Sequence, residues 1–208
     1  MKKTKIAMVA AGILAAGVAG CASMMGEPDH AGEALATMKR SFKEHGQAKL
    51  DRLDQDEAQK LCSQYHGDKV IPKDVAARIE KAQLDAIKYP AGSLLGDWKE
   101  GEKVAQSGVG KQYNDDPTKP SGGNCYACHQ LTKAEVSFGT IGPSLQNFGK
   151  VRGFTPDMQK YAYGKVYNSM AFSACSSMPR FGHQKVLTEK QIKDVVALLM
   201  DPKSPVNQ

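Results

Sequence analysis

The sequence predicts an all-α fold for this chain of 208 residues. In two segments, apolar residues recur every three or four positions, which is the spacing of one face of an α-helix. Glycine and proline residues separate these segments from their neighbours, and we find no alternation of apolar and polar residues typical of a strand. We therefore expect helices joined by loops.

The chain begins with a pattern that is typical of a bacterial secretory signal. Lys2, Lys3 and Lys5 precede an apolar run over residues 6–18. That run is shorter than the about 20 residues that a membrane-spanning helix needs. We predict that residues 1–20 are a signal peptide and that the mature protein works in the periplasm, where disulfides can form.

Cys21 follows this signal directly. The sequence VAGC that ends at Cys21 resembles a lipobox, in which the cysteine is lipidated and becomes the mature N-terminus. Ordinary cleavage near Ala22 or Ser23 is the alternative, and it would leave Cys21 in the discarded peptide. A membrane contact is expected only through such a lipid anchor.

The charge of the chain argues against a nucleic-acid partner. The net charge of +6 falls to about +3 when the three lysines of the signal are removed. The sequence contains no arginine-rich run or basic stripe, so the remaining charge indicates an ordinary solvated surface.

Residues 21–92 are predicted to form a tether, over 22–31, and a helical N-terminal extension. Its clearest helix begins at Pro72, because proline at the start of a helix costs no backbone hydrogen bond. Val75 and Ile79 lie on one face of that helix, and we expect the extension to cap the second domain.

Residues 93–208 are predicted to form that second domain. Helices are expected over 97–107, 155–170 and 188–200, with loops between them and an exposed tail over 204–208. Thr188 and Gln191 have the spacing of a capping box, which marks the start of the last helix.

The central motif of this domain is Cys125-Tyr126-Ala127-Cys128-His129. In an exported bacterial chain, C-x-x-C-H is typical of covalent haem attachment. The two thiols add across the vinyl groups of one haem c, and the histidine binds the iron. A zinc site would need two further ligands, and a thioredoxin-like site would need a βαβ pattern. The other histidines are scattered and no strands are predicted, so one haem c is expected.

Two other cysteines, Cys62 and Cys175, remain after this assignment. In an oxidising compartment they are expected to form a disulfide with each other. A free or intermolecular thiol is the alternative, because sequence alone does not determine the distance between them.

Met178 is the expected second ligand of the haem iron. It lies on a loop, and Pro179 disfavours a helix at this position. His183 is the alternative, and histidine in place of methionine would lower the reduction potential. The Pro143 carbonyl is a candidate acceptor for the second ring nitrogen of His129. Arg180 is expected to pair with a haem propionate or a partner, or to be an ordinary surface arginine.

These features together resemble a class I cytochrome c, over about residues 93–203. A closer resemblance is to the SoxX family, the cytochrome subunits of the thiosulfate-oxidising Sox system, in its longer form with an N-terminal extension. The stretches YPAGSLLGDWKEGEKVAQSG, GGNCYACHQL, GTIGPSL and MPRFGHQKVLTEKQIKDVVALLMDPKSPVN carry this resemblance. It implies a class I cytochrome c fold with an N-terminal helical extension.

The resemblance also implies a function. SoxX-like chains form a heterodimer with a SoxA-like c-type cytochrome, and the pair is an L-cysteine S-thiosulfotransferase that conjugates thiosulfate to a cysteine of a SoxYZ-like carrier. The sulfur chemistry would occur on the partner subunit, so this chain is expected to hold no catalytic residue. It would accept the electrons, with Cys125, Cys128, His129 and Met178 holding the haem, and would pass them to a small cytochrome c.

Two other functions are open to a monohaem cytochrome. A free-standing periplasmic electron carrier is the main alternative. A dihaem peroxidase would need a second C-x-x-C-H motif, which the sequence lacks. A gas-binding cytochrome usually carries its haem motif near the C-terminus, whereas here a long segment follows His129.

Overall fold

The structure is a computed structural model that describes residues 30–65, 67 and 69–208. The predicted signal peptide and Cys21 lie outside these residues. The chain divides into two compact units, residues 1–42 and 43–208. The described part of the first unit, residues 30–42, contains the helix α2 (His30–Ser41), none of whose residues is buried. This helix begins within the segment that was expected to be a tether.

The second unit contains the other helices of the part of the chain that the structure describes. They are α3 (Glu57–Gln64), α4 (Lys73–Asp85), α5 (Trp98–Gln106), α6 (Phe148–Arg152), α7 (Pro156–Tyr167) and α8 (Glu189–Met200). Short 3-10 turns are η1 (Leu50–Leu53), η2 (Cys125–Ala127), η3 (Ser169–Ala171) and η4 (Pro205–Asn207). Within the described residues the β-structure is one isolated bridge between His45 and Ala48, so the all-α prediction is confirmed.

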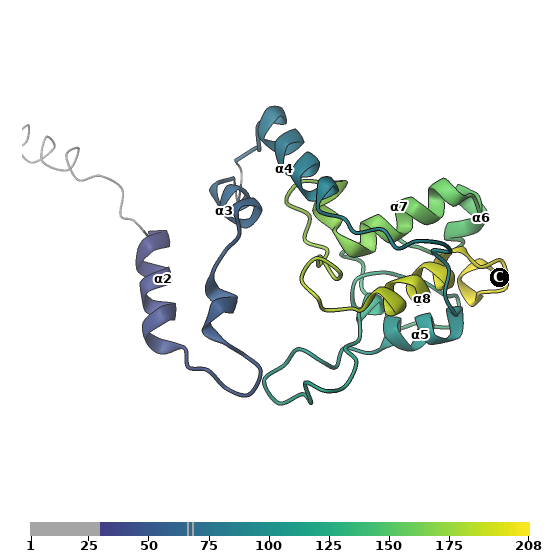
Figure 1. The fold of residues 1–208 in the computed structure, drawn as a ribbon, viewed down its shortest axis with the longest axis horizontal. Coiled ribbons are helices and arrows are strands. Elements are labelled where there is room, and N and C mark those ends of the chain that lie inside the picture. The colour runs from purple at the N-terminus through teal and green to yellow at the C-terminus, as the bar shows by residue number, and fades with distance from the viewer. Residues whose placement is uncertain (1–29, 66, 68) are drawn as a thin grey trace, which may run out of the picture. The chain divides into compact units, whose positions relative to one another are not determined.

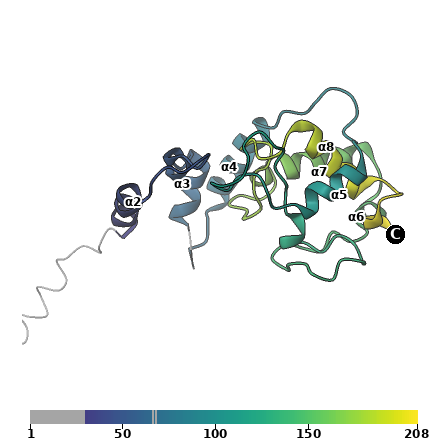
Figure 2. The ribbon, with the colours of Figure 1, turned by 90° about the horizontal axis from the view of Figure 1, so that it is seen from below.

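The pair α5 and α8 forms the centre of this unit, and the two helices lie side by side in both ribbon views (Figures 1 and 2). Nearly every residue of α8 from Ile192 onward is buried, and Val196 and Leu198 are fully enclosed. Gly101 of α5 allows the close approach, because a side chain there would collide with the backbone carbonyl of Asp194. Helix α7 covers α8.

The helix boundaries follow local signals in the sequence. Thr188 and Gln191 form the expected capping box at the start of α8. Asp97 and Thr155 cap α5 and α7 with their side chains. Pro72 precedes α4, as expected, because it lacks the amide hydrogen that would otherwise be unpaired.

The helices α3 and α4 build a second, smaller core. It consists of Ala58, Val75 and Ile79 together with Met170, which comes from η3. The extension therefore packs on the segment between α7 and α8, through apolar residues of α3 and α4. The compact unit begins at Lys43, so these helices belong to the same unit as the segment that begins at residue 93.

The C-terminal tail corrects an expectation. Residues 204–208 were expected to be exposed, but Ser204, Val206 and Asn207 are fully buried. Two of their side chains bind backbone carbonyls at the end of α8. The Ser204 hydroxyl donates to the Leu198 carbonyl at 2.5 Å, and the Asn207 side-chain amide donates to the Leu199 carbonyl at 3.1 Å. In the part of the chain that the structure describes, no helix is long and apolar enough to cross a bilayer.

Candidate functional site

The C-x-x-C-H motif forms a tight loop that is hydrogen-bonded to itself. Cys125 begins the 3-10 turn η2, and the His129 amide donates to the Cys125 carbonyl at 2.9 Å. Asn124 precedes the turn in the left-handed backbone region, at φ 47°, a conformation that asparagine tolerates better than most residues. The loop is tied to α5, because the Gly123 amide donates to the Val104 carbonyl at 2.8 Å.

The buried Tyr126 anchors the middle of the motif. Its hydroxyl donates to the Glu102 carboxylate at 2.8 Å and lies 3.3 Å from the Thr132 hydroxyl. Burial raises the pKa of Tyr126, and the hydrogen bond to Glu102 raises it further, so this hydroxyl remains a donor at neutral pH. Tyr126 therefore attaches the motif to α5 through a buried side chain.

The two thiols on either side of Tyr126 are free to form thioethers. Cys125 and Cys128 are half-buried, and neither forms a disulfide. Burial raises the pKa of the Cys125 thiol to about 12. Among the described residues, no group of three or more His, Cys, Asp or Glu side chains is placed to hold a metal ion.

His129 is oriented by the loop that follows the motif. Its Nδ1 lies 2.7 Å from the Pro143 carbonyl oxygen, as the sequence suggested. Since a carbonyl only accepts, Nδ1 is the donor of this hydrogen bond, which leaves Nε2 as the ring nitrogen that can bind a metal ion. Gly142 lies against the imidazole so closely that a Cβ atom there would overlap the ring. This donor set, two thiols and one oriented imidazole, fits haem c.

Met178 lies on a second loop, between η3 and α8, and its side chain packs against the main core. Its carbonyl accepts a hydrogen bond from the Ser169 hydroxyl at 2.5 Å, and its amide donates to the Ser176 hydroxyl at 3.3 Å. The structure thus places Cys125, Cys128 and His129 on one loop and Met178 on another.

The remaining methionines of this domain lie in regular elements. Met158 is in α7, Met170 is in η3 and Met200 is buried in α8. Met170 belongs to the smaller core under the extension, and Met158 and Met200 pack in the main core. Each therefore has a packing role.

The surroundings of His183 place it beside an ion pair. Burial lowers its pKa, the charge of Arg180 lowers it further, and the charge of Asp56 raises it. The backbone of His183 is fixed by its amide, which donates to the Tyr167 carbonyl at 3.0 Å.

Arg180 is not the ordinary surface arginine that was one of its expected roles. Its side chain is only 3% exposed, and it donates to the Asp56 carboxylate at 2.6 Å and to the Gln83 side chain at 3.0 Å. The guanidinium thus contacts the extension of its own chain. The cause is that α3 and α4 cover the loop, and a buried charge requires a partner.

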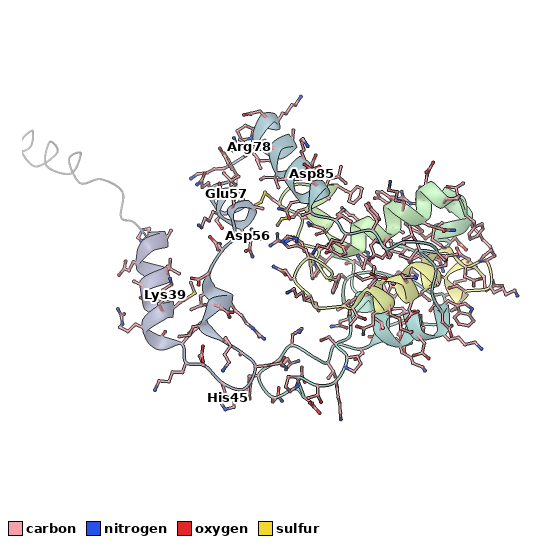
Figure 3. The ribbon with its side chains drawn as sticks, viewed as in Figure 1. Lys39, His45, Asp56, Glu57, Arg78 and Asp85 are labelled. Atoms are coloured by element: carbon pink, nitrogen blue, oxygen red, sulfur yellow. A yellow bond between two sulfur atoms is a disulfide. The ribbon has the colours of Figure 1, made fainter. Side chains whose placement is uncertain are left out.

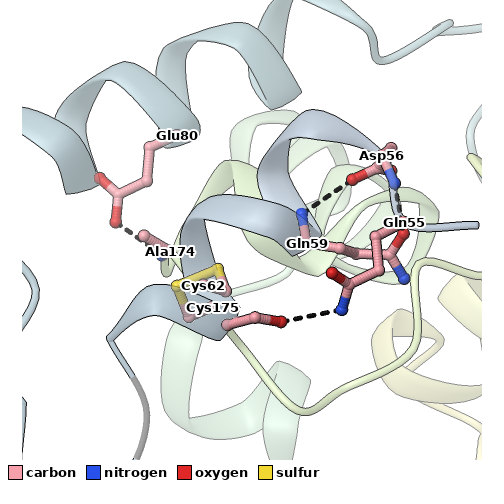
Figure 4. Close-up of a disulfide and its surroundings, with 8 residues drawn as sticks. Gln55, Asp56, Gln59, Cys62, Glu80, Ala174 and Cys175 are labelled. Atoms are coloured by element: carbon pink, nitrogen blue, oxygen red, sulfur yellow. Dashed lines mark hydrogen bonds between the residues drawn. A yellow bond between two sulfur atoms is a disulfide. The ribbon is translucent and has the colours of Figure 1, made fainter. Parts of the chain in front are cut away.

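The disulfide between Cys62 and Cys175 links α3 to the loop of Met178 (Figure 4). The two cysteines are 113 positions apart in the sequence, and their Cα atoms are 5.4 Å apart. The structure thus places these cysteines in the intramolecular bridge rather than in free thiols.

Three functional neighbours were not identified from the sequence: Asp56, Gln83 and Gly142. Asp56 lies at the beginning of α3 (Figure 3), where it forms a capping box with Gln59. The spacing of that capping box is visible in the sequence and could have located this helix start. Gly142 stands before a proline in a Gly-Pro pair, which indicates a turn but not a contact with histidine. We find no sequence signal for Gln83.

Comparison with known proteins gives three matches. Residues 110–202 match the cytochrome c family. The chain is 37% identical over 204 residues to a protein described as an uncharacterized lipoprotein of Aquifex aeolicus (strain VF5), and the match covers 94% of this chain and 95% of that protein. Among solved structures, the crystal structure of SoxXA from P. pantotrophus matches with a TM-score of 0.39 and 25% identity, over 58% of this chain and 92% of that one.

Proposed function

This chain belongs to the same family as the Aquifex aeolicus lipoprotein and contains a cytochrome c domain, and on that premise we propose that it is a periplasmic monohaem cytochrome that accepts electrons from a partner subunit. The cytochrome c domain implies a covalently bound haem c. When bound, the haem supplies a one-electron couple between ferric and ferrous iron.

The residues of the motif hold the haem in this proposal. Cys125 and Cys128 form the thioethers, and His129 binds the iron through Nε2. The observation that carries the assignment is the 2.7 Å contact between His129 Nδ1 and the Pro143 carbonyl. It fixes the imidazole plane and increases the basicity of Nε2, while both neighbouring thiols are unbridged.

Met178 is the second axial ligand in this proposal. Two observations favour Met178 over His183. The side chain of Met178 packs against the main core from a loop, whereas His183 lies beside the charges of Arg180 and Asp56. A thioether ligand raises the reduction potential relative to a second imidazole, which suits an electron acceptor. With His129 and Met178 both bound, the iron would have no free position for a substrate.

The finer assignment is to the electron-accepting subunit of a SoxAX-type L-cysteine S-thiosulfotransferase. Its support is the sequence resemblance to the SoxX family in the stretches around the haem motif and over residues 178–207. In the reaction, the outer sulfur of thiosulfate bonds to a cysteine sulfur of the carrier, and the cysteine proton and two electrons are released. Because one haem holds only one extra electron, the first electron is passed to a small cytochrome c before the second arrives.

Cys21 bears on where this protein works. The relative is described as a lipoprotein, which supports acylation of Cys21 and a lipid anchor on the periplasmic side of a membrane. The intact mass of the mature chain tests this. An acylated N-terminal cysteine supports the anchor, and cleavage after Cys21 contradicts it.

The experiment that tests the function is a gentle affinity purification of the tagged chain from its native host grown on thiosulfate, followed by haem staining. An equimolar second haem protein, which on addition of thiosulfate and its carrier reduces the haem of this chain, is the expected result. A lone haem band that growth on thiosulfate does not change would contradict the partner and leave a free-standing carrier.

A further inference from the structure

The loop that carries Met178 is held by the N-terminal extension rather than by the haem motif. We define the Met178 loop as residues 172–182, between η3 and the turn that precedes α8. The residues that hold this loop through side chains lie mostly on α3, on α4 and just before α3. These are the helices to which the cytochrome resemblance assigns no role in the haem site.

Two strong connections flank Met178 in sequence. Cys175, three positions before it, is bonded to Cys62 of α3. Arg180, two positions after it, is buried and forms an ion pair with Asp56 at 2.6 Å. Since Asp56 is the N-cap of α3, both connections end on the same short helix.

Helix α4 adds weaker contacts to the same loop. The Glu80 carboxylate accepts a hydrogen bond from the Ala174 amide at 2.9 Å (Figure 4). The Gln83 side chain accepts from Arg180 at 3.0 Å and from the buried Asn168 at 3.0 Å. Helix α4 thus holds both the start of the loop and the segment that leads into it.

The backbone of Cys175 depends on these contacts. Its φ is +60°, in the left-handed region that side chains with a Cβ atom avoid. A residue persists there when its surroundings determine the conformation. The surroundings of Cys175 are the disulfide partner and the apolar residues of the smaller core, all supplied by or shared with the extension.

From these contacts we propose that α3 and α4 form a clamp that sets the position of the Met178 thioether as an axial ligand. Cys62, Cys175, Asp56 and Arg180 are its positioning residues. The inference rests on the proposed function, because it takes Met178 as the ligand. It goes further in assigning the extension a role in tuning the haem rather than in stability alone.

The clamp has a measurable chemical consequence. A methionine ligand on a loosened loop leaves the iron for part of the time, and an external ligand then binds at the vacated position. If the fraction of detached methionine rises from about 1% to about 10%, the apparent affinity for that ligand rises about tenfold. The reduction potential falls at the same time, because the thioether favours the ferrous state.

The test compares full-length mature holoproteins at a temperature well below their unfolding midpoints. One variant, Cys62→Ser with Cys175→Ser, removes the disulfide. A second, Asp56→Asn, keeps an oxygen acceptor at the N-cap of α3 but removes the charge that faces Arg180. We would measure the methionine–iron charge-transfer band of the ferric protein, its imidazole dissociation constant and its midpoint potential.

The expected result is a weaker band, an imidazole dissociation constant that is about tenfold lower and a lower potential in both variants. A matched control is Asn207→Ala, which removes buried hydrogen bonds at the end of α8 and lowers thermal stability. It should leave all three haem properties unchanged. Should the double variant not fold, the Asp56→Asn variant carries the test alone.

The proposal would be overturned if both clamp variants kept the wild-type band, imidazole affinity and midpoint potential and only their melting temperatures fell. The variant Met178→Ala, measured in parallel, separates this failure from that of the proposed function. If Met178→Ala keeps the charge-transfer band, the ligand assignment itself is wrong. If it loses the band while the clamp variants keep theirs, the ligand stands and the clamp does not.

Discussion

At the scale of single residues, the imidazole of His129 depends on a residue without a side chain. Gly142 lies directly against the ring, and its amide donates to the Cys128 carbonyl at 2.8 Å. The next residue, Pro143, supplies the carbonyl that orients Nδ1. One dipeptide thus fixes both the position and the rotation of the imidazole ring.

We expect Gly142→Ala to displace the imidazole, because its Cβ atom would overlap the ring. The ferric protein should then show a partial high-spin spectrum, and its midpoint potential should change. Optical absorption and electron paramagnetic resonance measure both. Ser144→Ala is the control, since its hydroxyl bonds to Gln130 and not to the ring. A wild-type spectrum in Gly142→Ala would show that the loop relaxes without moving His129.

The ion pair of Asp56 predicts a response to acid. Burial alone would raise the pKa of this carboxyl, but the Gln59 amide and the Arg180 guanidinium outweigh it and hold the pKa below its ordinary value. A lowered carboxyl pKa contributes stability that is complete above about pH 4 and is lost as the pH falls through the folded-state value.

The free energy of unfolding should therefore fall as the pH is lowered below about 4 in wild type, and it should fall less in Asp56→Asn by the amount that one titrating carboxyl contributes. Denaturant unfolding at a series of pH values measures this. Asp157→Asn, on the exposed first turn of α7, serves as the control and should follow wild type. Parallel curves for wild type and Asp56→Asn would contradict the role of this carboxylate.

At the scale of elements, the packing of α5 against α8 supports the haem motif. The C-x-x-C-H loop is hydrogen-bonded to α5 at the Val104 carbonyl and the Glu102 carboxylate. Helix α5 lies close to α8 because Gly101 has no side chain. A change in the separation of these helices would therefore reach the haem loop.

We expect Gly101→Ala to destabilise the fold by about 2 kcal/mol. Overpacking costs about 1–3 kcal/mol, and the higher helix propensity of alanine offsets about 1 kcal/mol at most. Chemical denaturation measures the change. Lys103→Ala, on the exposed side of the same helix, should change the stability by less than about 0.5 kcal/mol. Equal stability of Gly101→Ala and wild type would show that α5 and α8 separate without cost.

Predictability from sequence also differs between elements. The starts of α4, α5, α7 and α8 follow local caps and prolines, so the sequence locates them well. The tail over residues 204–208 is polar and was expected to be exposed. Ser204, Val206 and Asn207 are buried instead, because Ser204 and Asn207 bind the last carbonyls of α8, and such pairing depends on where the chain turns after the helix.

At the scale of the whole molecule, the contacts of the C-x-x-C-H motif are easier to predict from the sequence than the contacts of the Met178 loop. The C-x-x-C-H motif and Pro143 are close in sequence, and a metal-binding histidine usually donates its other ring N–H, so the sequence indicated this carbonyl as a candidate acceptor. The partner of Arg180 lies on a different helix, 124 positions away in sequence, and nothing local indicates it. A buried arginine cannot be distinguished from a surface one until the packing of α3 and α4 is known.

The molecule as a whole combines a haem loop supported by α5 and α8 with a methionine loop held by α3 and α4. The extension is covalently joined to the methionine loop and shares its smaller core. This arrangement suits the proposed electron carrier, because the chain would hold both proposed iron ligands, His129 and Met178, in place.

The most direct test of the proposed function is the absorbance of this haem during the reaction it is proposed to serve. The ferric chain, bound to its SoxA-like partner, is mixed with a SoxYZ-like carrier and thiosulfate, and the ferrous α-band is followed. We predict reduction that requires the partner, the carrier and thiosulfate together, and that stops when any one is omitted. A haem that remains ferric in the complete mixture, or that is reduced equally well without the partner, would contradict the account.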